Sequence, residues 1–190
     1  MKTFLLSVLI FSLANCFAQR TTRTIDSLKE LLTISKEDTN KVWLLNSLSR
    51  KYLFYDPDSA VQYAHEGLSL AKELNFEKTL TESELFWSLS FAYSILGDYP
   101  NALKYWSQCI KVSTEIHSMD QLTWAYAILC DSYRDQGNYP EALKNIEMAR
   151  SFSLGNPSDN MYCDRMKASV LEQANQLDSA LIYLNRAFPL

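Results

Sequence analysis

Two stretches forty positions apart decide the fold of this chain: Gly97-Asp98-Tyr99-Pro100-Asn101-Ala102-Leu103-Lys104 and Gly137-Asn138-Tyr139-Pro140-Glu141-Ala142-Leu143-Lys144. Six of the eight paired positions are identical. Self-similarity at a fixed period of 20–50 residues is the signature of stacked structural repeats. Arrays of this kind present extended binding surfaces. The sequence therefore predicts the architecture more directly than the ligand.

An alanine recurs at one position of each repeat. Ala60, Ala102, Ala142 and Ala180 lie 42, 40 and 38 residues apart. A small side chain is needed where two helix backbones approach closely, because a larger one would push the helices apart. The spacing predicts a repeat domain over residues 39–190. Its four approximate repeats cover residues 39–77, 78–118, 119–156 and 157–190.

Each repeat has the pattern of a helical hairpin. Phe86, Leu89, Tyr93 and Leu96 follow one another at intervals of three or four, which places them on one helix face. Glycine then ends the helix, because it accepts the left-handed conformation required there. Asp98 and Asn138 are expected to cap the second helices of the inner repeats, with a proline in the first turn of each. In the outer repeats the expected caps are Asp58 and Asp178.

The N-terminal residues 1–18 have the pattern of a secretory signal peptide. Lys2 is followed by an apolar run too short to cross a bilayer, and cleavage is expected before Gln19. An alternative is a lipid anchor on Cys16, and another is a buried N-terminal helix. Residues 19–38 are expected to form a lead helix and linker. The predicted location is the periplasm or the extracellular space.

Charge and cysteine content exclude several classes of function. The net charge of −4 and the pI near 5.2 give no basic field for nucleic acid or an anionic membrane. Cys109 and Cys130 are expected to be small core side chains, with a disulfide between them as the alternative. The histidines lie apart and no CxxC pair occurs, so no metal site is expected. No cofactor is expected either, and after residue 18 no segment approaches the length of a membrane span. Catalytic motifs are also absent, and the chain is not expected to be an enzyme.

The repeats resemble tetratricopeptide repeats. Phe86-x-x-Leu89-Ser90-x-x-Tyr93 followed by Ala102-x-x-x-Trp106 is similar to the pattern W-x2-L-G-x2-Y…A-x3-F, and the third repeat matches it again. The resemblance implies an all-α, right-handed superhelical solenoid of antiparallel helix pairs, with about four hairpins and the lead helix. The usual period is 34 residues, whereas here it is near 40. The extra residues are expected to lengthen the helices or loosen the turns between repeats.

A second resemblance concerns the beginning of the chain. The signal peptide and the segments at residues 25–32, 38–41 and 56–60 look like the start of exported bacterial sensors. In those proteins the repeats precede a membrane helix and a histidine kinase or helix-turn-helix output domain. The resemblance implies two alternatives: a free-standing interaction module that binds a protein or peptide, or the sensory input part of a signalling protein.

In the tetratricopeptide family the first helices of successive hairpins line a concave groove. Carried over by register, the residues expected to face it are Trp43, Asn46 and Arg50, then Glu84, Trp87, Phe91 and Ser94, then Trp124, Ala127, Asp131, Arg134 and Asp135, and finally Tyr162, Arg165 and Glu172. An aromatic groove suits an extended peptide or an amphipathic helix. The alternative is that these aromatic side chains fill gaps between hairpins, or that the lead helix covers Trp43 and Trp87. The family's clamp for a C-terminal carboxylate is absent, because Trp87 and Phe91 stand in its place.

Overall fold

The computed structural model describes residues 23–188, and this part of the chain is all-α. Residues 23–34 are helical. The labelled helices that follow are α2 (Thr39–Tyr52), α3 (Pro57–Glu73), α4 (Leu80–Ile95), α5 (Tyr99–Glu115), α6 (Met119–Asp135), α7 (Tyr139–Phe152), α8 (Pro157–Gln173) and α9 (Leu177–Ala187). No strand occurs between residues 23 and 188. The expected all-α repeat fold is confirmed.

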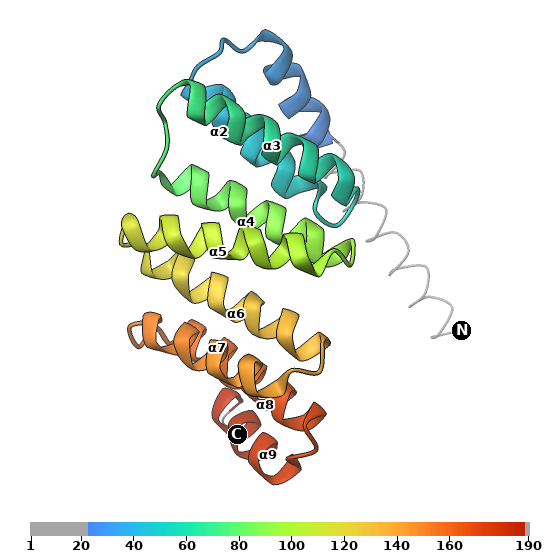
Figure 1. The fold of residues 1–190 in the computed structure, drawn as a ribbon, viewed down its shortest axis with the longest axis vertical. Helices are drawn as coiled ribbons and strands as arrows, with labels where there is room; N and C mark the ends of the chain where they lie inside the picture. Colours follow the sequence, from blue (N-terminus) through green and yellow to red (C-terminus); the bar gives the residue numbers. More distant parts are fainter. Residues whose placement is uncertain (1–22, 189–190) are drawn as a thin grey trace, which may run out of the picture.

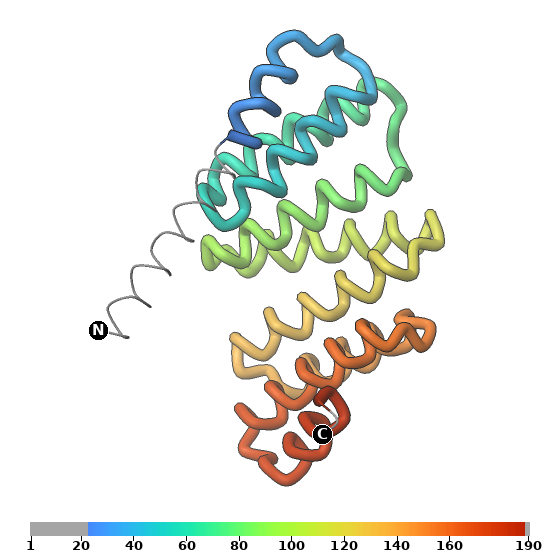
Figure 2. The backbone as a smooth tube through the Cα atoms, turned by 180° about the vertical axis from the view of Figure 1, so that it is seen from behind, coloured from blue at the N-terminus to red at the C-terminus, as the bar shows by residue number. Residues whose placement is uncertain are grey.

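The helices form four antiparallel hairpins stacked along the long axis of the molecule. Figure 1 shows the order α2/α3, α4/α5, α6/α7 and α8/α9, from the blue end to the red end. Figure 2 shows the same order from behind. The first helices touch one another in succession (α2–α4, α4–α6, α6–α8), whereas no two second helices of the described chain are in contact. Helices on the inside of a curved stack lie closer together, so the first helices form the concave face.

The turns within the inner hairpins follow the duplicated octapeptide. Gly97 and Gly137 have φ values of 76° and 74°, in the left-handed region where glycine carries no Cβ penalty. Asp98 accepts a hydrogen bond from the Asn101 backbone N–H at 3.2 Å, and Asn138 does the same for the next repeat at 3.5 Å. A proline follows within the first turn of α5 and of α7. These sequence predictions are confirmed.

The caps expected in the outer hairpins are wrong. Asp58 and Asp178 lie in the first turns of α3 and α9. The cap of α3 is Asp56, which accepts a hydrogen bond from the Ser59 N–H at 3.3 Å. Gln176 occupies the cap position of α9 without a side-chain hydrogen bond. In every hairpin the cap lies four residues before the repeated alanine, and the two expected residues lie only two before it.

The core between the helices is built from small residues and aromatic rings. The four repeated alanines are buried, as the close-crossing argument requires. Trp106 is completely buried between the second and third hairpins, where Cys109 and Ala125 surround it. Cys109, Cys130 and Cys163 are free and buried, so the alternative Cys109–Cys130 disulfide is wrong. Burial raises the pKa of Cys130 to about 12, so this thiol is an unreactive core side chain.

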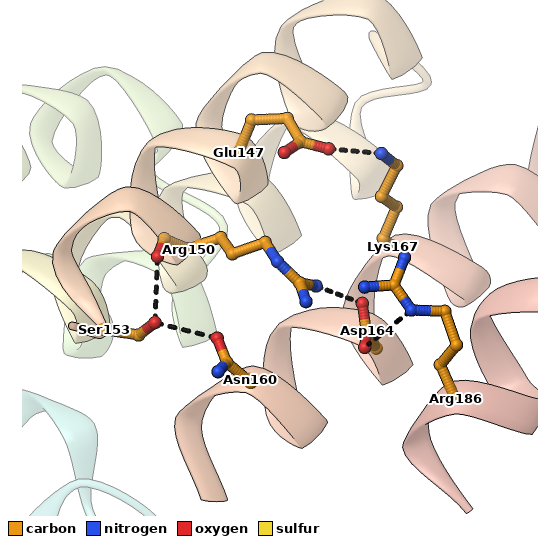
Figure 3. A network of polar contacts seen from close by, with 7 residues as sticks. All are labelled: Glu147, Arg150, Ser153, Asn160, Asp164, Lys167 and Arg186. Atoms are coloured by element: carbon orange, nitrogen blue, oxygen red, sulfur yellow. Dashed lines mark hydrogen bonds and ion pairs between the residues drawn. The ribbon is translucent and has the colours of Figure 1, made fainter. Parts of the chain in front are cut away.

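A charged network fixes the last hairpin to the third. The Asp164 carboxylate, only 6% exposed, pairs with Arg150 from α7 and lies 3.6 Å from Arg186 Nε of α9. Beside it, Lys167 of α8 pairs with Glu147 of α7 (Figure 3). Because one buried carboxylate contacts cations from both neighbouring helices, it joins α7, α8 and α9 in a single arrangement.

The N-terminal helical residues cover the outer end of the first hairpin. Ile25 is buried against Leu48 and Tyr52, and Lys29 Nζ lies 5.3 Å from the Tyr52 ring centre. The predicted signal peptide at residues 1–18 and the alternative lipid anchor at Cys16 lie outside the described residues. From residue 23 to 188, no helix has the length and apolar character needed to span a bilayer.

Candidate functional site: the concave groove

Ten side chains singled out from the sequence line hollows on the concave face. They come from the first helices α2, α4, α6 and α8, and each lines at least one of four neighbouring hollows. The ten are Trp43, Asn46, Arg50, Trp87, Phe91, Trp124, Asp131, Arg134, Tyr162 and Arg165. Residues from four separate repeats therefore gather on one surface, which we call the groove.

The α2 hollow lies at the N-terminal end of the groove and has a volume of about 480 Å³. Trp43 lines it and is 59% exposed, so the lead helix does not cover this indole. Asn46 also lines it but is only 2% exposed, and its Nδ2 donates a hydrogen bond to Glu84 Oε2 at 2.7 Å. Asn46 is therefore a positioning side chain for Glu84.

Glu84 joins the α2 hollow to the central hollow. Arg50 Nη1 donates to Glu84 Oε1 at 3.0 Å, and the same guanidinium lies 5.7 Å from the Trp87 ring centre. The central hollow measures about 330 Å³ and is lined by Arg50, Glu84, Trp87, Asp120, Gln121 and Trp124. It thus brings together α2, α4 and α6. Trp124 is 42% exposed and also lines the hollow beside α8.

The α4–α6 hollow, of about 290 Å³, is aromatic on one side and charged on the other. Phe91 stacks on Trp87 with ring centres 5.4 Å apart. Arg134 Nη1 lies 2.6 Å from Asp131 Oδ1, at an angle that forms no hydrogen bond, and Nη2 donates to Asp135 at 2.8 Å. Burial raises the pKa of Asp131 to about 6, against the opposing effect of Arg134.

The α8 hollow, of about 210 Å³, closes the groove at the C-terminal end. The Trp124 and Tyr162 ring centres lie 5.0 Å apart, and the Arg165 guanidinium lies 5.2 Å from the Tyr162 ring. Burial raises the pKa of Tyr162 to about 12, so the phenol stays neutral. Phe188, from the end of α9, also lines this hollow.

The set of groove residues predicted from the sequence contains errors and omissions. Ala127 is completely buried in the core, so its expected position in the groove is wrong. Glu172 is exposed but lines none of these hollows. Asp120 and Gln121 were missed, although Asp120 lies one helical turn before Trp124 and shares its face. The alternative that the lead helix covers the groove tryptophans is partly correct for Trp87, because this indole is half-buried against a core cluster that contains Ile25.

Comparison with known proteins gives a match to one family model. The model of the SusR N-terminal TPR domain matches residues 13–104. The match covers just under half of the chain, and together with the four helical hairpins it supports assignment to the tetratricopeptide repeat family. A search of the curated proteins finds no match. The tetratricopeptide fold is typically a non-catalytic scaffold.

Solved structures share the fold at low sequence identity. BtubC (BKLC) from P. vanneervenii superposes with a TM-score of 0.77 at 16% identity, over 88% of this chain and 72% of that one. TPR-like repeats of a Podosopora anserina kinesin light chain candidate give a TM-score of 0.71 at 16% identity, over 93% and 90% of the two chains. MamA gives 0.62 at 19% identity, over 92% and 90%. These similarities concern the fold alone.

Proposed function

We propose that this chain is an exported interaction module that binds a peptide segment of a partner protein in the groove. The observation that carries the proposal is the row of four hollows along α2, α4, α6 and α8, each lined by aromatic or charged side chains. A partner segment lying along the row would contact every hairpin. Repeat solenoids use their extended concave surfaces in this way.

The composition of the groove supports a protein ligand. Trp43 and Trp124 keep 59% and 42% of their surface in contact with water. Tryptophan, tyrosine and arginine are the residues that most often dominate binding energy at interfaces. The hollows follow one another along the groove and hold about 210 to 480 Å³ each, which suits successive side chains of one peptide better than one compact ligand.

Export is the second element of the proposal. It rests on the signal-peptide pattern at residues 1–18 and on the similarity of residues 13–104 to the SusR N-terminal TPR domain. Expression with a reporter fused after the chain tests it. We expect the reporter to appear outside the cytoplasm. We expect it to stay in the cytoplasm when charged residues interrupt Phe4–Leu13. Equal export of both forms would contradict it.

Selection of random peptides displayed on phage tests binding in the groove. We expect the selected peptides to bind the protein and to lose at least tenfold in affinity for Trp124→Ala, because truncating a central interface tryptophan commonly costs about 2 kcal/mol or more. Tyr55→Ala is the matched control, since Tyr55 is 71% exposed and lies outside the hollows. Equal binding to both variants would contradict the proposal.

A second candidate is the sensory input part of a signalling protein. The observation that favours it is the match to a domain described as N-terminal in SusR, together with the sensor-like segments of the sequence. The DNA following codon 190 separates the candidates. An in-frame membrane helix and output domain would replace the free-standing module with a sensor, whereas a stop codon would exclude the sensor.

A further inference from the structure

The central hollow has an unbalanced charge. Its ionisable side chains are one arginine, Arg50, and two carboxylates, Glu84 and Asp120. Arg50 and Glu84 neutralise each other at 3.0 Å. Asp120 is exposed, and no cation of the described chain lies within ion-pair distance of its carboxylate. One negative charge therefore remains without a counterion at the middle of the groove.

The unpaired carboxylate lies next to an exposed indole. Asp120 and Trp124 are separated by four residues on α6, which places them on the same helix face one turn apart. Both line the central hollow, and Trp87 lines it from α4. A cation held against an indole face is attracted by the ring quadrupole. The hollow already contains an example, because the Arg50 guanidinium lies 5.7 Å from the Trp87 ring centre.

We propose that the central hollow binds a lysine or arginine side chain of the partner peptide, between Trp87 and Trp124 and beside Asp120. This inference rests on the proposed groove function and names its specificity. The volume of about 330 Å³ is at the lower end of ligand pockets, which suits one long side chain. The aliphatic stem of the basic residue packs against the indoles while its charged end reaches Asp120.

Other side chains fit the hollow less well. An acidic side chain would need Arg50, which is already engaged by Glu84, and moving Arg50 would leave Glu84 without its charged partner. An aliphatic side chain would bury apolar surface against the indoles but would desolvate Asp120 without pairing it. Only a cation gains from both the rings and the carboxylate.

Titration with three short peptides tests the specificity. The peptides have blocked, uncharged ends and differ only in a central arginine, norleucine or glutamate. The indole N–H signals of the protein are followed by two-dimensional NMR and assigned with Trp87→Phe and Trp124→Phe. We expect the arginine peptide to shift both signals with about tenfold higher affinity than the norleucine peptide, and the glutamate peptide to bind weakest.

Paired variants identify the carboxylate. Asp120→Asn is expected to lower the affinity for the arginine peptide about threefold and to leave the affinity for the norleucine peptide unchanged. Asp178→Asn is the matched control, because Asp178 is an exposed first-turn acid on α9 and its loss changes the net charge equally. Raising the ionic strength from about 0.1 M to about 1 M should remove most of the arginine preference, since the Debye length falls from about 10 to 3 Å.

The outcomes separate this inference from the proposed function. Equal shifts by the norleucine and arginine peptides would overturn the cation specificity while supporting a peptide groove. Equal effects of Asp120→Asn and Asp178→Asn would overturn the role of Asp120. If no peptide shifts either indole signal at millimolar concentration, the cation site is wrong, and the phage selection then decides on the groove independently.

Discussion

Arg50 Nη1 lies 3.0 Å from Glu84 Oε1, and this ion pair ties α2 to α4 on the floor of the groove. Asn46 holds the other carboxylate oxygen at 2.7 Å, so Glu84 is fixed from two positions on α2. The consequence is that the only arginine of the central hollow is already engaged. The charge selectivity of that hollow therefore depends on this ion pair as well as on Asp120.

Removing this pair should change the preference of the groove. Glu84→Gln releases Arg50 from its ion pair. We therefore expect the affinity for the glutamate peptide to rise about threefold and the affinity for the arginine peptide to fall by a similar factor. The same NMR titration measures both. Glu141→Gln is the control, because Glu141 pairs with Lys144 at 3.2 Å on the far helix layer. Unchanged preference in Glu84→Gln would show that Arg50 does not set the selectivity.

Asp131 should make the stability depend on pH. Its folded pKa is raised to about 6 by burial, above the ordinary value of 3.8. A raised folded pKa means that the stabilising contribution is present below about pH 4 and is lost as the pH rises through about 6. We expect wild-type protein to lose on the order of 2 kcal/mol relative to Asp131→Asn across this window. Urea unfolding at several pH values measures the difference, and parallel profiles would refute this assignment.

Asp164 should contribute to stability, because its buried carboxylate contacts two arginines from different helices. Asp164→Asn leaves Arg150 and Arg186 without their shared partner. Breaking a buried pair costs about 3–5 kcal/mol, but both arginines are partly exposed, so we expect about 2 kcal/mol. Denaturant unfolding gives the value, with Asp178→Asn as the exposed control. A loss no larger than that of the control would show that the network does not hold the last hairpin.

Gly97 should be required for its backbone conformation alone. An added Cβ would meet no atom within 4 Å, yet the φ value of 76° disfavours other residues. Gly97→Ala is therefore expected to destabilise the protein by about 1 kcal/mol, and Gly97→Asn by less, because asparagine tolerates the left-handed region. Thermal unfolding of the two variants tests the order. Equal stability of wild type and Gly97→Ala would mean that the turn relaxes to a different conformation.

The sequence predicts most of the fold because its signals are local. The glycine turn, the first-turn proline and the close-packed alanine each act within a few residues, and the duplication marks them twice. The caps at Asp58 and Asp178 failed because the expectation followed residue type instead of the register shared with Asp98. Here the position relative to the alanine was the better guide.

The sequence predicts which residues lie on the groove surface better than it predicts the contacts between them. The family register brought ten side chains to one face, because residues on successive first helices must follow the stacking. Ala127 failed although its spacing puts it on the same helix face as Trp124 and Asp131, because its short side chain is covered in the core cluster that α6 forms with α7 and α8. The pairing of Asn46 with Glu84, and the arrival of Phe188 beside Tyr162, depend on packing between distant repeats and leave no local signal.

A crystal structure of the protein with a peptide from the phage selection tests the groove and its cation site most directly. We expect the peptide to lie along α2, α4, α6 and α8 and to place a basic side chain between Trp87 and Trp124. A peptide bound on the convex face formed by α3, α5 and α7, with the four hollows unoccupied, would contradict it.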